Sequence, residues 1–195
     1  MKLLGRATSG NVQKVIFLLE ELGASYERED YGKQFGNTAT DDYLALNPTG
    51  KVPTLVDGDL SIWESHSILR YIAQKSKSDL YPADLAQRSK IDRWMDWLLA
   101  SLNGAYVSIF KATKGGEPVP ESSVAEMNAS LKLLEAHLAT NDYLAGDAFS
   151  LADVALGPIA HRCLGFPVDR PSTPNVSAWH ERLAARPAFQ KATGG

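Results

Sequence analysis

The sequence predicts an α/β domain followed by an all-α domain. Short apolar runs alternate with helical patterns up to about residue 75, and a polar break follows over residues 78–85. Beyond this break the apolar residues recur only at helical spacing. A chain of 195 residues is long enough for two small domains. We therefore expect a first domain over residues 1–77, a linker over 78–85 and a second domain over 86–195.

The first domain begins with a β-α-β pattern. Apolar side chains between Val12 and Leu22 recur at helical spacing, and Gly23 supplies a stop after them. The loop that follows the second strand is rich in glycine and polar residues. The expected elements are a strand over 2–5, a helix over 12–22, a strand over 26–31, a loop over 32–40 and a short helix over 41–46.

The stretch 47–73 completes this domain. It opens with a polar turn, and an Asp57-Gly58 turn then joins two short apolar runs, which predicts a β-hairpin. Glu64-Ser65 begins a helical pattern that carries Ile68, Leu69 and Ile72 on one face. The order β-α-β followed by β-β-α is the thioredoxin-like arrangement. Its βαβ half requires a parallel strand pair with a right-handed crossover.

The second half predicts a helical bundle. Ser150 and Asp153 have the spacing of an N-capping box, with an aspartate in place of the usual Glu or Gln. We expect both residues to serve folding and not catalysis. The expected helices cover 85–111 and 124–138, with a breaker over 113–120, and two more begin near Asp153 and Asn175, the last of which ends at Arg186-Pro187.

Composition restricts the function classes. The net charge is only −3, which does not favour binding to nucleic acid or to an anionic membrane, and no apolar run is long enough to span a bilayer. Cys163 is the only cysteine, so no internal disulfide can form, and a reducing cytoplasm is expected. The four histidines show no metal-ligand spacing, so no metal site is expected.

The pairs Val52-Pro53 and Glu64-Ser65, together with Ser150 and Asp153, resemble the motifs of the soluble, bacterial-like glutathione S-transferase family. The resemblance spans essentially the whole chain. It implies a homodimeric transferase that conjugates the thiolate of glutathione to a small, apolar electrophile. Glutathione is then a co-substrate, and no tightly bound cofactor is implied.

The resemblance assigns glutathione to named positions. A cis peptide before Pro53 would leave the Val52 backbone free to pair with the peptide as one more strand residue. Ser65 at a helix N-terminus would bind the γ-glutamyl carboxylate, and Glu64 the neighbouring ammonium. The glycyl carboxylate would be bound by Lys51, assisted by Gln34 in the preceding loop.

In the family that the sequence resembles, a Tyr, Ser or Cys between the first strand and the first helix donates a hydrogen bond that activates the thiol. A free thiol with a pKa of about 8.5 is only a few per cent thiolate at neutral pH. The segment contains no tyrosine or cysteine, which departs from the classes that use those residues. Ser9 matches the serine position best, with Asn11 next and Thr8 third, so the resemblance is to a serine/asparagine-loop type of the family.

The acceptor substrate would lie against the long helix. Asn103, Tyr106 and Phe110 share one helical face there and offer one polar and two aromatic groups, although such a stripe is more often core. Cys163 is expected to be a structural thiol. His66 lies outside the family pattern and is expected to be partly exposed.

Three alternative functions remain open at this point. A glutathione-dependent disulfide reductase or peroxidase would need no protein cysteine, because two glutathiones can occupy the site. A dehalogenase or isomerase on the same fold would need additional polar groups near the thiol. A non-catalytic binding module on the same fold is the third, although it would not need the peptide clamp formed by Val52, Glu64 and Ser65.

Overall fold

The computed structural model describes residues 1–194, and their contacts divide the chain into two units. The first unit consists of Met1–Tyr81 and of the segment that begins at Arg186, and the second is Pro82–Ala185. The elements of the first unit are β1 (Lys2–Leu4), α1 (Gly10–Glu21), β2 (Glu27–Glu29), a 3₁₀ turn (Lys33–Phe35), α2 (Asp41–Leu46), β3 (Thr54–Asp57), β4 (Leu60–Trp63), α3 (Ser65–Lys75) and α9 (Pro187–Thr193).

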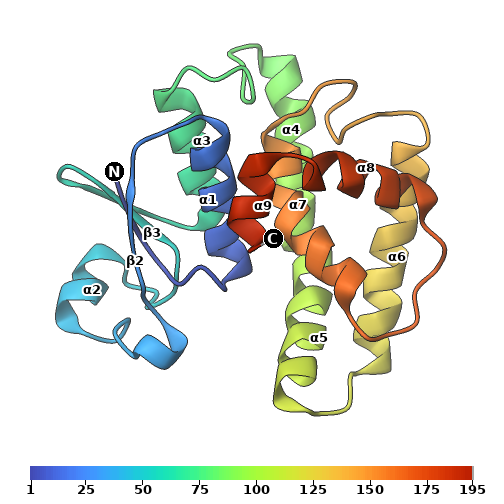
Figure 1. The fold of residues 1–195 in the computed structure, drawn as a ribbon, viewed down its shortest axis with the longest axis horizontal. Helices are drawn as coiled ribbons and strands as arrows, with labels where there is room; N and C mark the ends of the chain where they lie inside the picture. Colours follow the sequence, from blue (N-terminus) through green and yellow to red (C-terminus); the bar gives the residue numbers. More distant parts are fainter. Residues whose placement is uncertain (195) are drawn as a thin grey trace. The chain divides into compact units, whose positions relative to one another are not determined.

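The first unit is built on one four-stranded mixed sheet in the order β2-β1-β3-β4. The strands β1 and β2 are parallel, and the other two pairings are antiparallel. Leu3 is paired with Leu55, and both side chains are completely buried. Helices α1, α3 and α9 lie together on one side of the strands, and α2 lies on the other (Figure 1). This is the thioredoxin-like arrangement that the β-α-β and β-β-α patterns predict.

The last helix differs from the expectation. Arg186-Pro187 ends α8 as predicted, but Pro187 then opens a further helix, α9, since proline suits the first helical turn. This helix packs on α1, with the rings of Phe17 and Phe189 edge to face at 5.2 Å. Lys191 Nζ lies 2.7 Å from a Glu20 carboxylate oxygen. By contacts the segment from Arg186 therefore groups with the first unit, whereas the sequence had suggested the helical domain.

The second unit is entirely helical in its regular structure. The predicted long helix forms one helical run with a π-helical turn in the middle. Helix α7 is deeply buried, since every residue from 151 to 160 is buried. The elements are α4 (Leu85–Trp97), the π turn (Leu98–Leu102), α5 (Asn103–Gly115), α6 (Glu121–Leu138), α7 (Leu151–Gly165) and α8 (Pro174–Ala184).

The predicted capping box is present at the start of α7. The Asp153 carboxylate accepts hydrogen bonds from the Ser150 N–H and hydroxyl, both at 2.9 Å. Its other oxygen accepts from the Leu144 N–H at 3.0 Å and from Trp179 Nε1 at 2.9 Å. Asp153 is fully buried, so this cluster fixes the start of α7 to the preceding loop and to α8.

Candidate glutathione site

The beginning of α1 supplies two polar side chains that its own helix does not use. Ser9 is the N-cap residue of α1, yet its side chain makes no capping hydrogen bond. Asn11 lies half-buried in the first turn. Both residues line a cavity of about 290 Å³, together with Lys51 and Val52. Thr8, the third candidate for the thiol, is exposed and does not line this cavity.

The loop before β3 is fixed by two buried side chains. Tyr43 and Asn47 are almost fully buried, and both donate to the Lys51 carbonyl, at 2.6 and 2.8 Å. Both also contact the Thr54 hydroxyl at 2.9 Å. The Val52–Pro53 peptide is cis, as the sequence predicts. The loop backbone beside the cavity is thus held by a hydrogen-bonded network.

The N-terminus of α3 meets the N-terminus of α1 beside this cavity. Ser65 is buried, and its hydroxyl lies 3.5 Å from Asn11 Oδ1. Glu64, the N-cap of α3, is exposed and has φ +67°, in a left-handed region that strains a residue with a side chain. Backbone strain of this kind is often found at binding sites. Two helix N-termini, each electropositive, are therefore directed to one place.

A buried basic pair lies behind Ser65. Lys14 of α1 is completely buried, and its Nζ lies 3.2 Å from Nε2 of His66. Burial lowers the pKa of Lys14 to about 7, although the Glu64 carboxylate opposes this shift. Burial also lowers the pKa of His66 far below its usual range, with smaller contributions from Lys14 and Arg70. The expectation of a partly exposed His66 is wrong, because α1 covers its ring.

The sequence missed several residues around this cavity, and four predicted glutathione contacts do not line it. Three of these are Pro53, Glu64 and Ser65. Gln34 lies exposed in the 3₁₀ turn and does not line the cavity, whereas its neighbour Lys33 does. A polar, glycine-rich loop contains no periodic signal that could have selected between these positions. The remaining lining residues that the sequence did not single out are Arg6, Gly32, Thr38 and Gly50.

The predicted acceptor residues lie on α5 of the second unit. Tyr106 is buried, and its ring stacks on Phe166 with centroids 6.0 Å apart. Phe110 is half-buried beside it, and the Arg162 guanidinium lies 5.3 Å from the Phe110 ring centroid. Asn103 is half-buried. None of the three lines the cavity of about 740 Å³ that α6 and the segment 166–169 form in this unit.

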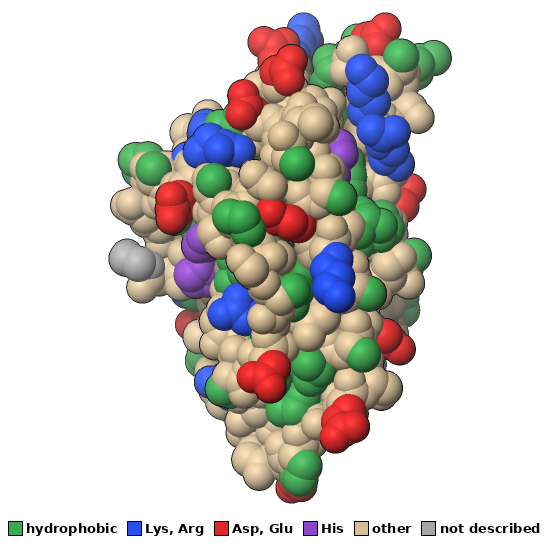
Figure 2. Space-filling view, turned by 90° about the vertical axis from the view of Figure 1, so that its right-hand side faces the viewer, with side chains coloured by type: hydrophobic (Ala, Val, Ile, Leu, Met, Phe, Trp, Pro, Cys, Tyr) green, Lys and Arg blue, Asp and Glu red, His purple; other side chains and the backbone are tan. Residues whose placement is uncertain are grey.

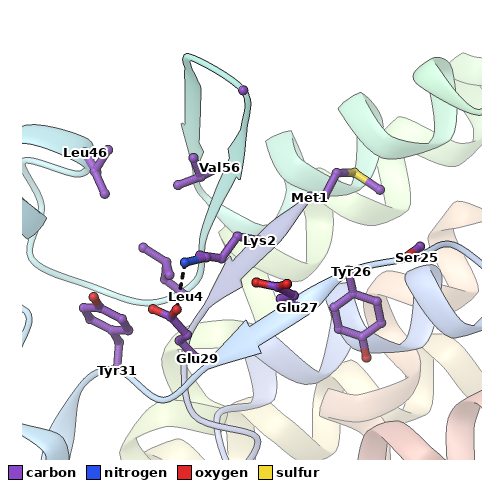
Figure 3. A pocket seen from close by; sticks show the side chains of 11 residues that line it. Met1, Lys2, Leu4, Ser25, Tyr26, Glu27, Glu29, Tyr31, Leu46 and Val56 are labelled. Atoms are coloured by element: carbon purple, nitrogen blue, oxygen red, sulfur yellow. Dashed lines mark hydrogen bonds and ion pairs between the residues drawn. The ribbon is translucent and has the colours of Figure 1, made fainter.

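Other features of the molecule lie away from this site. A second hollow, of about 590 Å³, is lined by residues of β1, β2 and β3, and in it Lys2 forms an ion pair with Glu29, with Tyr31 nearby (Figure 3). Positive and negative side chains are interspersed over the face shown in Figure 2. Cys163 is buried, which raises its pKa to about 12.

Two searches of the described residues were negative. Residues 1–194 contain no group of three or more His, Cys, Asp or Glu side chains that could hold a metal ion. In the same part of the chain, every helix is too short or too polar to cross a bilayer.

Two family patterns and several known proteins match most of the chain. The family pattern "Glutathione S-transferase, N-terminal domain" matches residues 1–74, and "Glutathione S-transferase, C-terminal domain" matches residues 95–187. Glutathione S-transferase GstB of Escherichia coli K12 is 35% identical over 97% of this chain and 95% of its own length. Glutathione S-transferase 3 of Zea mays is 38% identical over 98% of this chain and 92% of its own.

A solved structure is similar over the same extent. The theta class glutathione S-transferase of Xanthomonas axonopodis pv. citri, solved with glutathione bound, has a TM-score of 0.91 and 36% sequence identity. The match covers 100% of this chain and 97% of that one. The chain therefore belongs to the glutathione S-transferase family.

Proposed function

We propose that this protein is a glutathione transferase that joins the sulfur of glutathione to a small, apolar electrophile. The observation that carries the proposal is a cavity lined by the start of α1 and by the loop before β3, with the start of α3 in contact with Asn11 at its edge. The N-terminus of α1 brings Ser9 and Asn11, the loop before β3 brings the Val52 backbone, and α3 brings Ser65. Its relatives are named glutathione S-transferases, and one was solved with glutathione bound, which supports glutathione as the co-substrate.

Each part of glutathione has a matching partner in this proposal. The backbone of Val52 pairs with the cysteinyl unit of glutathione as an added strand residue. The Ser65 N–H and hydroxyl bind the γ-glutamyl carboxylate at the start of α3, while the exposed Glu64 pairs with the ammonium. The exposed Lys51 at the cavity rim, with a lesser contribution from Gln34, binds the glycyl carboxylate.

Ser9 and Asn11 are the proposed catalytic residues, which places the protein in the serine/asparagine-loop type. Lowering a thiol pKa by about two units requires about 2.7 kcal/mol of preferential thiolate stabilisation. The Ser9 hydroxyl, which the helix cap leaves uncommitted, and the Asn11 amide are hydrogen-bond donors that can supply this beside the positive end of α1. The thiolate then attacks the electrophile and displaces its leaving group.

The proposal extends to the acceptor and to the assembly. Tyr106, Phe110 and Asn103 form the acceptor side, and their aromatic surface suits an apolar electrophile. The chain works as a homodimer, which is typical of the family, in the cytoplasm.

A conjugation assay with a halo-aromatic acceptor tests the proposal. We expect activity in the wild type, and an apparent thiol pKa that rises by about one unit in Ser9→Ala or Asn11→Ala, since one charge-assisted hydrogen bond contributes about 1.5 kcal/mol. Ser67→Ala, an exposed position on α3, is the matched control. Turnover of a small disulfide without conjugation would favour the reductase alternative. An unchanged pKa in both variants would contradict the roles of Ser9 and Asn11.

A further inference from the structure

Lys14 carries a charge into the interior of the first unit. Its side chain is completely buried, and a His66 ring nitrogen at 3.2 Å is the hydrogen-bond partner of its ammonium. Among residues 1–194 no carboxylate lies within ion-pair distance of Lys14, and the closest negative influence is that of Glu64. The His66 Nδ1 atom is also buried, and it has no hydrogen-bond partner in the described structure.

A cation in this position destabilises the fold on its own. Moving an ammonium out of water costs several kcal/mol even after relaxation, and only a well-placed anion offsets this. The lowered pKa of Lys14 expresses the same penalty. An apolar side chain of similar length would fill the space without it. The charge is therefore best explained by an anion that the chain itself does not contain.

The position of Lys14 identifies the kind of anion. Lys14 lies one helical turn beyond Asn11 on α1, and its partner His66 directly follows Ser65 on α3. The ammonium thus lies behind the point where the two helix N-termini meet and where Ser65 and Asn11 are 3.5 Å apart. Helix N-termini with free backbone N–H groups bind carboxylates. A ligand carboxylate bound by Ser65 would lie at the helix end whose next residue, His66, contacts Lys14.

We propose that Lys14 is a positioning residue whose buried ammonium, acting through His66 and the Ser65 end of α3, is the counter-charge of the γ-glutamyl carboxylate of glutathione. Ligand binding and protonation of Lys14 are then linked, and each favours the other by the same factor. This inference rests on the proposed function, because it takes glutathione as the ligand.

The charges around Lys14 determine the sign of the linkage. From α3, Glu64 is the one charged side chain whose field acts on Lys14, and His66 contacts it, whereas Arg70 acts on His66. Lys191 of α9 and Arg186, the N-cap residue of α9, are bound to Glu20 and Glu21 at the far end of α1. The bound carboxylate stabilises the Lys14 ammonium and raises the pKa of Lys14. At a pH above the pKa that Lys14 has in the free protein, binding is therefore accompanied by uptake of a proton. The ligand's own ammonium pairs with Glu64 on the exposed side.

Calorimetric titration with S-methylglutathione tests this linkage. The methyl group removes the thiol, so no proton is released from sulfur. Titrations at pH 8 in buffers of different ionisation enthalpy give the number of protons taken up on binding. If the carboxylate raises the pKa of Lys14 by about one unit, the wild type takes up about 0.4 proton.

Three variants make the test specific. Lys14→Met removes the charge and should bind about tenfold more weakly than the wild type at pH 6, while the two should bind equally above pH 9. Lys14→Arg keeps the charge without titrating, so it should bind tightly with no proton uptake. Lys90→Met, an exposed lysine on α4, should behave as the wild type.

The outcomes separate this inference from the proposed function. Binding by the wild type without proton uptake, or a Lys14→Met to wild-type affinity ratio that does not change with pH, would overturn the role of Lys14 alone. A merely structural lysine would give such a constant ratio. Failure of the wild type to bind S-methylglutathione at any pH would overturn the proposed function and this inference with it.

Discussion

Replacement of Asp153 by alanine should strongly destabilise the protein. The carboxylate is fully buried and accepts four hydrogen bonds, two on each oxygen. The Ser150 hydroxyl can rotate to another acceptor, but the N–H groups of Leu144, Ser150 and Trp179 cannot. Each buried donor left without a partner costs about 1–3 kcal/mol. Allowing for water that enters the new space, we expect Asp153→Ala to lower the free energy of unfolding by about 4 kcal/mol.

The asparagine variant should lie between alanine and the wild type. In Asp153→Asn the amide oxygen can replace Oδ1, which accepts from Leu144 and Trp179. The amide NH2 then faces Ser150, whose hydroxyl can accept from it but whose N–H loses its acceptor. One unsatisfied N–H in place of three predicts a loss of about 2 kcal/mol.

Urea unfolding followed by circular dichroism and tryptophan fluorescence measures these losses. Asp147→Ala, an exposed residue in the same loop, is the matched control and should change the stability by less than about 0.5 kcal/mol. The explanation fails if Asp153→Ala is as stable as this control, or if Asp153→Asn loses as much as Asp153→Ala.

Three further predictions concern other buried groups. Glu135→Ala should lower the free energy of unfolding, measured in urea, by about 2 kcal/mol, because the Glu135 carboxylate accepts three hydrogen bonds at the start of α8. Glu126, exposed on the same helix, is the control, and equal stability of Glu135→Ala and Glu126→Ala would refute this prediction. Cys163 should react with an aromatic disulfide at pH 8 about a thousandfold more slowly than glutathione, because burial raises its pKa to about 12, and unfolding in urea should abolish the difference. Lys14→Met should be more stable than the wild type by about 4 kcal/mol at pH 7, because folding lowers the pKa of Lys14 from 10.5 to about 7. Between pH 7 and pH 10.5, Lys14 is protonated in the unfolded wild type but not in the folded one, so the wild type becomes more stable as the pH rises. The stability advantage of Lys14→Met should therefore vanish near pH 10.5. A loss of stability in Lys14→Met that does not change with pH would contradict this prediction.

Local signals in the sequence were enough to predict the secondary-structure elements that position the site. The Asp57-Gly58 turn fixed the hairpin, Glu64-Ser65 marked the start of α3, and Val52-Pro53 indicated the cis peptide. Each of these depends on a few neighbouring residues, because turns and helix starts are determined by nearby side chains.

The long-range contacts of the site could not be predicted in this way. Lys14 lies in a run of α1 that is buried on every side, from Val12 to Leu19, whereas a lysine between apolar residues suggests an exposed face. Its contact with His66 joins residues 52 positions apart. The hydrogen bonds from Tyr43 and Asn47 to the Lys51 carbonyl likewise depend on the tertiary placement of α2. No pattern along a single sequence reports such pairs.

Calorimetric titration of the wild type and of Ser65→Ala with glutathione tests the central claim most directly. We expect one glutathione per chain, and a dissociation constant that Ser65→Ala raises about tenfold or more, since a hydrogen bond to a charged group contributes about 1.5–3 kcal/mol. Ser67 is exposed and directly follows His66 on α3, so the control variant Ser67→Ala should bind as the wild type does. Absence of binding to the wild type, or equal affinity in Ser65→Ala, would contradict the placement of glutathione at the meeting point of α1 and α3.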